Sequence, residues 1–194
     1  MTCWRSSNRG NGKDGRISHQ ESLQREEREK TTIRKVEIER FRVTSSKPFE
    51  SILQRLEAQI GHPDMNAFVK AVTAAESYGE LEKIVQKAIG TSGLMEFIRF
   101  NLGEIIRKER GTGSPRILRL VVGNPLIMKQ MAVHVHDVAS CAPVNILTDE
   151  RPGGVHLSYN QMASLLAPYG SADALAVARD LDSKIENLLR ESAV

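Results

Sequence analysis

Residues 116–131 read RILRLVVGNPLIMKQM, and this stretch decides the fold. Its first half is apolar apart from Arg116 and Arg119, which is the pattern of a central strand covered on both faces of a sheet. Gly123, Asn124 and Pro125 then supply a tight turn, a capping side chain and a helix-starting proline in direct succession. The stretch therefore predicts a buried strand that turns abruptly into a helix.

Strand and helix patterns alternate on both sides of this stretch. Strand patterns cover residues 33–44, 94–102, 144–148 and 155–159, and the last two flank the hairpin sequence DERPGG. Helical spacing covers residues 48–60, 64–72, 81–88, 126–131, 162–166 and 171–189. This incompletely alternating order predicts an α+β fold, with helices packed against a mixed or antiparallel sheet of about five strands. We expect a single domain over residues 32–193.

The first strand and the first helix carry irregular signals. In residues 33–44 the apolar phase changes midway, which predicts either a bulge or an end that leaves the sheet. Ser45 or Ser46 is expected to cap the first helix, with Pro48 early in its first turn.

Residues 1–31 are polar and basic, and they contain too few apolar side chains to offset the entropy of ordering. We therefore expect a disordered N-terminal tail. Gly10, Gly12 and Gly15 within it match the dinucleotide pattern G-x-G-x-x-G. We reject the match, because such a site needs a strand before the glycines and a helix after them.

Charge and cysteine content narrow the class of protein. Residues 31–194 hold 20 basic and 19 acidic side chains, so the body lacks the concentrated basic face typical of nucleic-acid binding, and we expect no nucleic-acid partner. Cys3 and Cys141 are the only cysteines, which favours a reducing, cytoplasmic location without a disulfide framework. No apolar run approaches the roughly 20 residues that span a bilayer, so we expect no membrane partner.

The turn at Gly123, Asn124 and Pro125 is the candidate ligand site. It is either an efficient strand-to-helix junction only, or a place where free N–H groups at the helix start face a cleft and bind a ligand. The second interpretation predicts a small pocket for an apolar or anionic molecule. Tyr159, beside the short helix at 162–166, is a further candidate for its lining.

His134, His136 and Cys141 form the alternative site, because these residue types can ligate a metal or haem in an enzyme or redox protein. The preceding residues have a helical pattern, and positions two apart diverge at a helix end, so we expect the histidines not to converge. The hydrolase pattern G-x-S-x-G is absent, and no cofactor is evident. We therefore favour a soluble ligand-binding or accessory module over an enzyme.

RILRLVVGNPLIMKQM, followed at residues 142–170 by APVNILTDERPGGVHLSYNQMASLLAPYG, resembles the family called domain of unknown function 302. KPFESILQRLEAQIG at residues 47–61 is similar to the first helix of that family. The resemblance covers about Ile33 to Leu189. It implies a compact α+β domain that commonly associates as a homodimer, and it brings no established catalytic residues.

Overall fold

The computed structural model describes residues 31–194, so the predicted tail, except for Thr31, lies outside the described residues. Contacts divide the chain after Lys35, and Val36–Val194 form one compact unit. This unit contains both helices and a sheet. The predicted α+β class is therefore confirmed.

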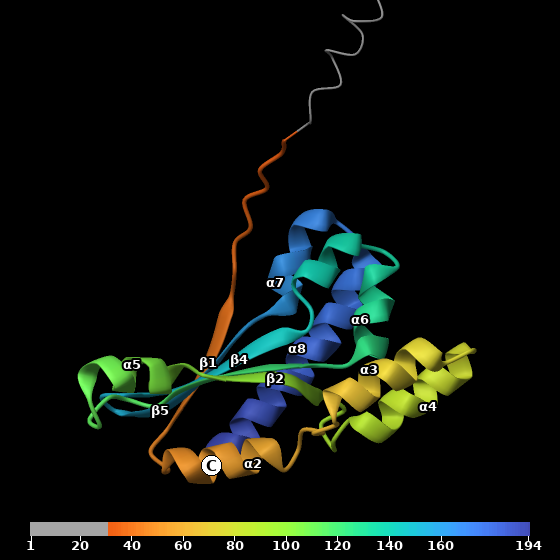
Figure 1. The fold of residues 1–194 in the computed structure, drawn as a ribbon. Helices are drawn as coiled ribbons and strands as arrows, with labels where there is room; N and C mark the ends of the chain where they lie inside the picture. The colour runs from red at the N-terminus through yellow and green to blue at the C-terminus, as the bar shows by residue number, and fades with distance from the viewer. Residues whose placement is uncertain (1–30) are drawn as a thin grey trace, which may run out of the picture. The chain divides into compact units, whose positions relative to one another are not determined.

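Five strands form one sheet in the order β1-β5-β4-β3-β2, and every pairing between them is antiparallel (Figure 1). Their bounds are β1 Arg40–Ser45, β2 Met95–Asn101, β3 Ile117–Gly123, β4 Val144–Arg151 and β5 Gly154–Asn160. The structure thus selects the antiparallel alternative for the predicted sheet. The predicted hairpin is present as β4 and β5, which pair from Arg151 opposite Gly154.

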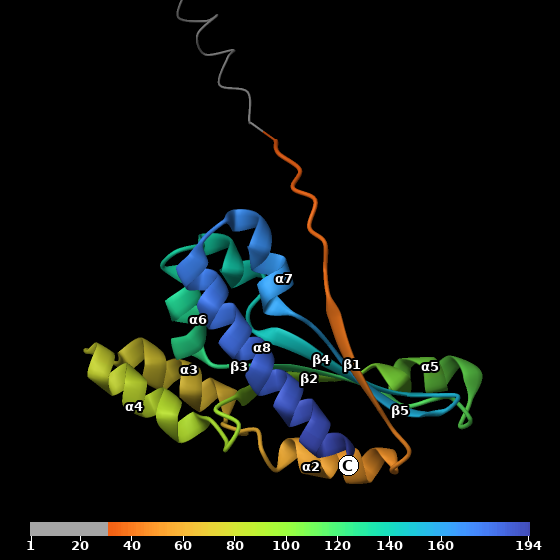
Figure 2. The same cartoon turned by 180° about the vertical axis from the view of Figure 1, so that it is seen from behind.

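Helices lie between several of the strands and follow the last strand. Their bounds are α2 Phe49–Glu57, α3 Met65–Ala74, α4 Tyr78–Ala88, α5 Leu102–Arg110, α6 Pro125–Ala132, α7 Met162–Leu166 and α8 Ala172–Ala193, with 3-10 turns at His136–Ser140 and Ala167–Tyr169. The longest helix, α8, crosses one face of the sheet (Figure 2). Its apolar stripe supplies Ala178, Ile185 and Leu188 to the buried core, as an amphipathic helix is expected to do.

The first strand and the first helix differ from their predicted boundaries. β1 begins only at Arg40, so the phase change marks an end that leaves the sheet. Pro48 directly precedes α2, and no side chain caps that helix. The predicted Ser45 cap is wrong because Ser45 ends β1 and its hydroxyl donates a hydrogen bond to the carbonyl of Ala193 on α8.

The predicted coverage of β3 on both faces is also wrong. Leu118, Leu120 and Val122 are buried, whereas Arg119 and Val121 between them are only half-buried. The strand lies between β4 and β2, one place from the edge of the sheet. Its continuous apolar run therefore conceals an alternation between a core face and a second face, which we call the open face of the sheet.

A second, smaller apolar cluster joins α3 and α4 to the sheet and α6. Its buried members are Phe68, Val85, Ala88, Met95 and Leu126. A side chain caps the N-terminus of each of these two helices. Asp64 accepts from the N–H of Ala67 at 2.9 Å, and Ser77 accepts from that of Glu80 at 3.2 Å.

The buried hydroxyl of Thr148 leads us to predict a stabilising substitution. Thr148 on β4 lies opposite Leu118 and Leu157, and its fully buried hydroxyl has no hydrogen-bond partner in the described residues. Thr148→Val keeps the side-chain shape and is expected to raise the free energy of unfolding by about 1 kcal/mol, measured by urea denaturation. Thr44→Val should give no such gain, because the Thr44 hydroxyl lies 3.0 Å from Nδ1 of His156. A less stable Thr148→Val protein would contradict the prediction.

Candidate functional site

The Gly123–Pro125 turn is held by the side chain of Asn124. Its Oδ1 accepts a hydrogen bond from the N–H of Leu126 at 2.9 Å, and its Nδ2 donates to the carbonyl of Gly93 at 2.9 Å. Asn124 therefore caps α6 and ties the turn to the loop before β2. Pro125 has no N–H, and the N–H of Leu126 is already bonded, so the start of α6 offers few donors to an anion.

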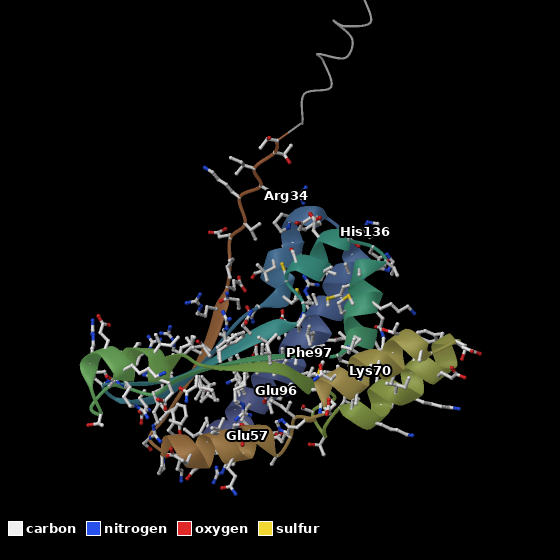
Figure 3. The ribbon with its side chains drawn as sticks, in the orientation of Figure 1. Arg34, Glu57, Lys70, Glu96, Phe97 and His136 are labelled. Atoms are coloured by element: carbon white, nitrogen blue, oxygen red, sulfur yellow. The ribbon has the colours of Figure 1, made fainter. Side chains whose placement is uncertain are left out.

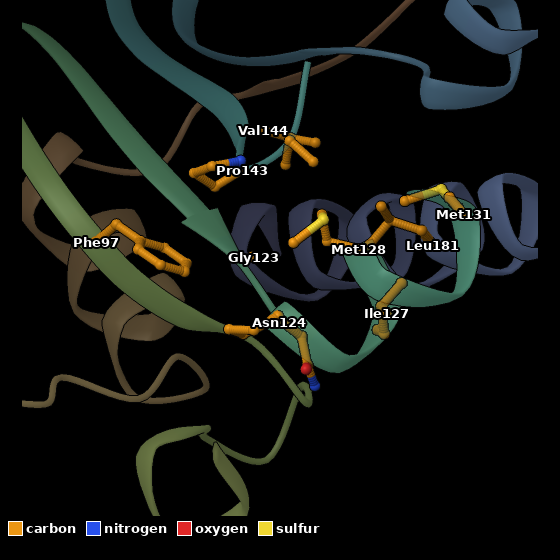
Figure 4. Close-up of a pocket in the computed structure, with 11 residues that line it drawn as sticks. Phe97, Gly123, Asn124, Ile127, Met128, Met131, Pro143, Val144 and Leu181 are labelled. Carbon is orange, nitrogen blue, oxygen red and sulfur yellow. The ribbon is translucent and has the colours of Figure 1, made fainter. Parts of the chain in front are cut away.

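An apolar pocket lies beside this turn (Figure 4). Its volume is about 110 Å³. The lining residues are Phe97, Gly123, Asn124, Pro125, Ile127, Met128, Met131, Ala142, Pro143, Val144 and Leu181. Pro143 is exposed whereas Met131 and Leu181 are buried, so the pocket extends from the surface to the core.

Gly123 shapes the pocket because it has no side chain. A Cβ atom on Gly123 would lie 3.1 Å from Cβ of Pro143 and 3.5 Å from Cε2 of Phe97. The first distance is shorter than a usual carbon–carbon contact. A methyl group there would crowd the gap between Phe97 and Pro143.

Three of the four predicted ligand residues, Gly123, Asn124 and Pro125, share this pocket, and Tyr159 does not line it. Phe97, Pro143 and Leu181 are among the lining residues that were not predicted from the sequence. Phe97 sits where the β2–β3 register shifts, and the apolar residues in both phases of 94–102 were the available signal. No local pattern marks Leu181, which comes from α8 and has the spacing of an ordinary core residue.

Tyr159 is instead part of a buried polar network. The side chain is 1% exposed, and its hydroxyl donates to Oδ1 of Asp182 at 2.6 Å. The same carboxylate accepts from the N–H of Met162 at 2.7 Å and, through Oδ2, from that of Ala163 at 2.9 Å. Asp182 on α8 thereby caps the start of α7, which has no cap of its own.

This network predicts a pH dependence of stability. Burial, and then the negative charge of Asp182, raise the pKa of Tyr159 well above its ordinary value. Since the pKa is raised on folding, the stabilisation is complete below the unfolded pKa of about 10 and is lost as pH rises further. Above that pH, the free energy of unfolding of the wild type should fall by about 1.4 kcal/mol per pH unit relative to Tyr159→Phe. Urea denaturation at pH 9 and pH 11 measures this, and a constant difference between the two proteins would contradict it.

His134, His136 and Cys141, the alternative site, do not form a cluster. Both histidines are exposed and Cys141 is half-buried, and His136 lies away from the pocket residue Phe97 in Figure 3. Within residues 31–194, no three His, Cys, Asp or Glu side chains are grouped so as to hold a metal ion. Among residues 31–194, these three side chains are therefore not arranged as a metal centre.

Among the helices of residues 31–194, none combines the length and the apolar character that crossing a membrane requires.

Fold and pocket together define a single-sheet α+β domain with a small apolar pocket where a strand turns into a helix. The model of the family described as Domain of unknown function DUF302 matches residues 70–192. The chain belongs to this family, and the predicted resemblance is confirmed.

Known structures also contain this fold. The chain is similar to the crystal structure of the uncharacterized conserved protein DUF302 from Bacillus stearothermophilus, with a TM-score of 0.55 and 14% sequence identity. The similarity covers 79% of this chain and 97% of that chain, and it supports the fold alone. No curated protein matches the sequence.

Proposed function

We propose that this chain is a non-catalytic binding or accessory module that holds a small apolar molecule in the pocket beside the Gly123–Pro125 turn. The observation that supports this most directly is the lining, in which Phe97, Ile127 and Met128 are only half-buried although they are apolar. Apolar cavities of about 150 Å³ stay dry and admit benzene or xenon. A pocket of about 110 Å³ suits the end of an apolar ligand of that width.

The satisfied polar groups favour an apolar ligand over the anionic alternative at this turn. Asn124 uses both its amide oxygen and its amide nitrogen within the protein. Its role is thus to fix the turn, and the apolar side chains provide the contact area. Burial of that area supplies roughly 25 cal/mol per Å² toward binding.

The pocket is tested by thermal denaturation in the presence of benzene and indole. A ligand at a hundred times its Kd stabilises the folded state by about 2.7 kcal/mol, which raises the Tm by several degrees. Met128→Trp, which places a large side chain in the pocket, should abolish the shift. The size-matched control is Val133→Trp, because Val133 is 61% exposed and does not line this pocket.

The proposal would be wrong if neither probe raised the Tm of the wild type. It would also be wrong if Met128→Trp and Val133→Trp responded alike, since the ligand would then bind elsewhere.

We further propose that the module is a homodimer in the cytoplasm. The outer edge of β1 carries backbone groups that no strand of the described residues pairs with, and large apolar side chains such as Ile98 and Ile105 are exposed. Cys141 is a free cysteine, as is usual in a reducing compartment. Sedimentation equilibrium should give twice the 21.6 kDa of one chain, and a monomer at all concentrations would contradict dimerisation.

A further inference from the structure

Arg119 is an unpaired cation on the open face of the sheet. It points away from the core because Leu118 and Leu120 on either side are buried. Its guanidinium carbon lies 4.4 Å from the centre of the Phe100 ring. Its Nε is buried and has no hydrogen-bond partner, and no carboxylate of residues 31–194 forms an ion pair with it.

The acidic residue nearby on this face already forms an ion pair with another arginine. Asp149 on β4 lies opposite Ile117, two residues from Arg119 along β3. Its carboxylate binds the guanidinium of Arg151. Arg119 is therefore a positive charge without an acidic partner, and it is held in place by stacking on Phe100.

Arg119 lies on the same face of β3 as the pocket residue Gly123. Arg119, Val121 and Gly123 alternate onto the same face of β3, and Gly123 lines the pocket. Val121, between them, lies opposite Ile98, which is 47% exposed, on β2 and opposite the exposed Asn145 on β4. Arg119 lies opposite Leu147. From Gly123 to Arg119 the strand advances four residues, or roughly 13 Å.

We propose that the open face and the pocket together bind a single-chain organic carboxylate, with its apolar end in the pocket and its carboxylate on Arg119. This inference rests on the proposed function and adds the chemical class of the ligand. A guanidinium matches a carboxylate in shape and hydrogen-bonding geometry. The guanidinium of Arg119 carries one positive charge and so matches one negative charge, which favours a carboxylate over a doubly charged phosphate.

The distance sets the length of the chain. Consecutive Cα atoms are 3.8 Å apart over three bonds, so an extended chain advances roughly 1.3 Å per bond. About ten bonds therefore span the path of roughly 13 Å. Decanoate is the matching probe, and decanol is the uncharged control of equal length.

The test compares the affinities of decanoate and decanol for the full chain by isothermal titration calorimetry, below the concentrations at which the probes form micelles. We expect decanoate to bind the wild type about tenfold more tightly than decanol. Arg119→Gln should remove this preference while leaving decanol binding unchanged. Arg40→Gln is the matched control, because Arg40 lies on the same face in the edge strand β1 and hydrogen-bonds only to Asn160.

Arg119→Lys keeps the experiment decisive if Arg119→Gln is poorly folded. It retains the charge, so part of the preference for decanoate should remain. Because the measured quantity is a ratio of two affinities in one protein, a general loss of stability does not change it.

Three outcomes overturn the inference, and they distinguish its failure from that of the proposed function. Equal affinities for decanoate and decanol, unaffected by Arg119→Gln, would show that Arg119 does not bind the carboxylate while the apolar pocket stands. No binding of decanoate by a protein that still responds to benzene would have the same meaning. No response to any of these probes would overturn the proposed function as well.

Discussion

Gly61→Ala is expected to lower the free energy of unfolding by more than about 3 kcal/mol, a large part of the stability of an ordinary domain. A Cβ atom on Gly61 would lie 1.9 Å from the carbonyl oxygen of Ala88 and 2.8 Å from the backbone nitrogen of Gly90. Both contacts are with backbone, which cannot rotate away. The substitution therefore forces two segments apart.

The contact around Gly61 joins two parts of the core. Gly61 follows α2, Gly90 follows α4, and the N–H groups of both donate to the carbonyl of Leu94 at 2.9 Å. The N–H of Glu96 in turn donates to the carbonyl of Gly61 at 2.8 Å. Separating the turns breaks these hydrogen bonds together with the packing of α4 on the sheet.

Gly79→Ala is the matched control for this prediction. Gly79 lies in the first turn of α4, and a Cβ atom there would meet nothing within 4 Å. Alanine is the better helix former, so Gly79→Ala should raise the free energy of unfolding by about 0.5–1 kcal/mol. Urea denaturation of both variants measures the contrast, and a Gly61→Ala protein of wild-type stability would show that the turns are not in contact.

Asp182→Ala should destabilise the protein by about 3–4 kcal/mol, because its carboxylate satisfies two buried donors and one half-buried donor at once. Without it, the buried Tyr159 hydroxyl and the buried N–H group of Met162 have at most one another as partners, and the N–H group of the half-buried Ala163 loses its acceptor. Helix α7 also loses its cap. Burial of unsatisfied donors is one of the mechanisms that give the largest mutational effects.

Two further variants test whether the lost hydrogen bonds cause the destabilisation of Asp182→Ala. Asp182→Asn keeps the size of the side chain but replaces one acceptor oxygen by a donor, so it should destabilise nearly as much as alanine. Asp180→Ala is the control, since Asp180 is exposed on the same helix and should change stability by less than about 0.5 kcal/mol. Equal effects of Asp182→Ala and Asp180→Ala would mean that the network contributes little.

Local signals in the sequence determined most of the secondary structure. Asp64, Ser77, Asn124 and Ser171 each cap the helix that follows them, because a cap depends on residues only a few positions apart. The hairpin turn around Pro152 is equally local. For the same reason the sequence placed the pocket's turn at the end of β3.

Ser45 shows where local reasoning fails. Serine is one of the residue types that commonly cap helices. The hydroxyl of Ser45, however, donates a hydrogen bond to the carbonyl of Ala193, far along the chain. Tyr159 likewise lies beside α7 as predicted, yet its hydroxyl is held by Asp182, 23 residues away. The residues around Ser45 and Tyr159 in the sequence do not indicate that Ala193 and Asp182 are their partners.

By itself, the sequence determined the family, the α+β class and the turn at Gly123. The tertiary structure decided which face of β3 is covered, and it brought Phe97 and Leu181 to the turn as walls of a pocket. The reason is that alternation along a strand shows which side chains share a face, whereas helices that pack from elsewhere in the chain decide which face they cover. Arg119, an interruption of an apolar run in the sequence, became a cation on the open face for that reason.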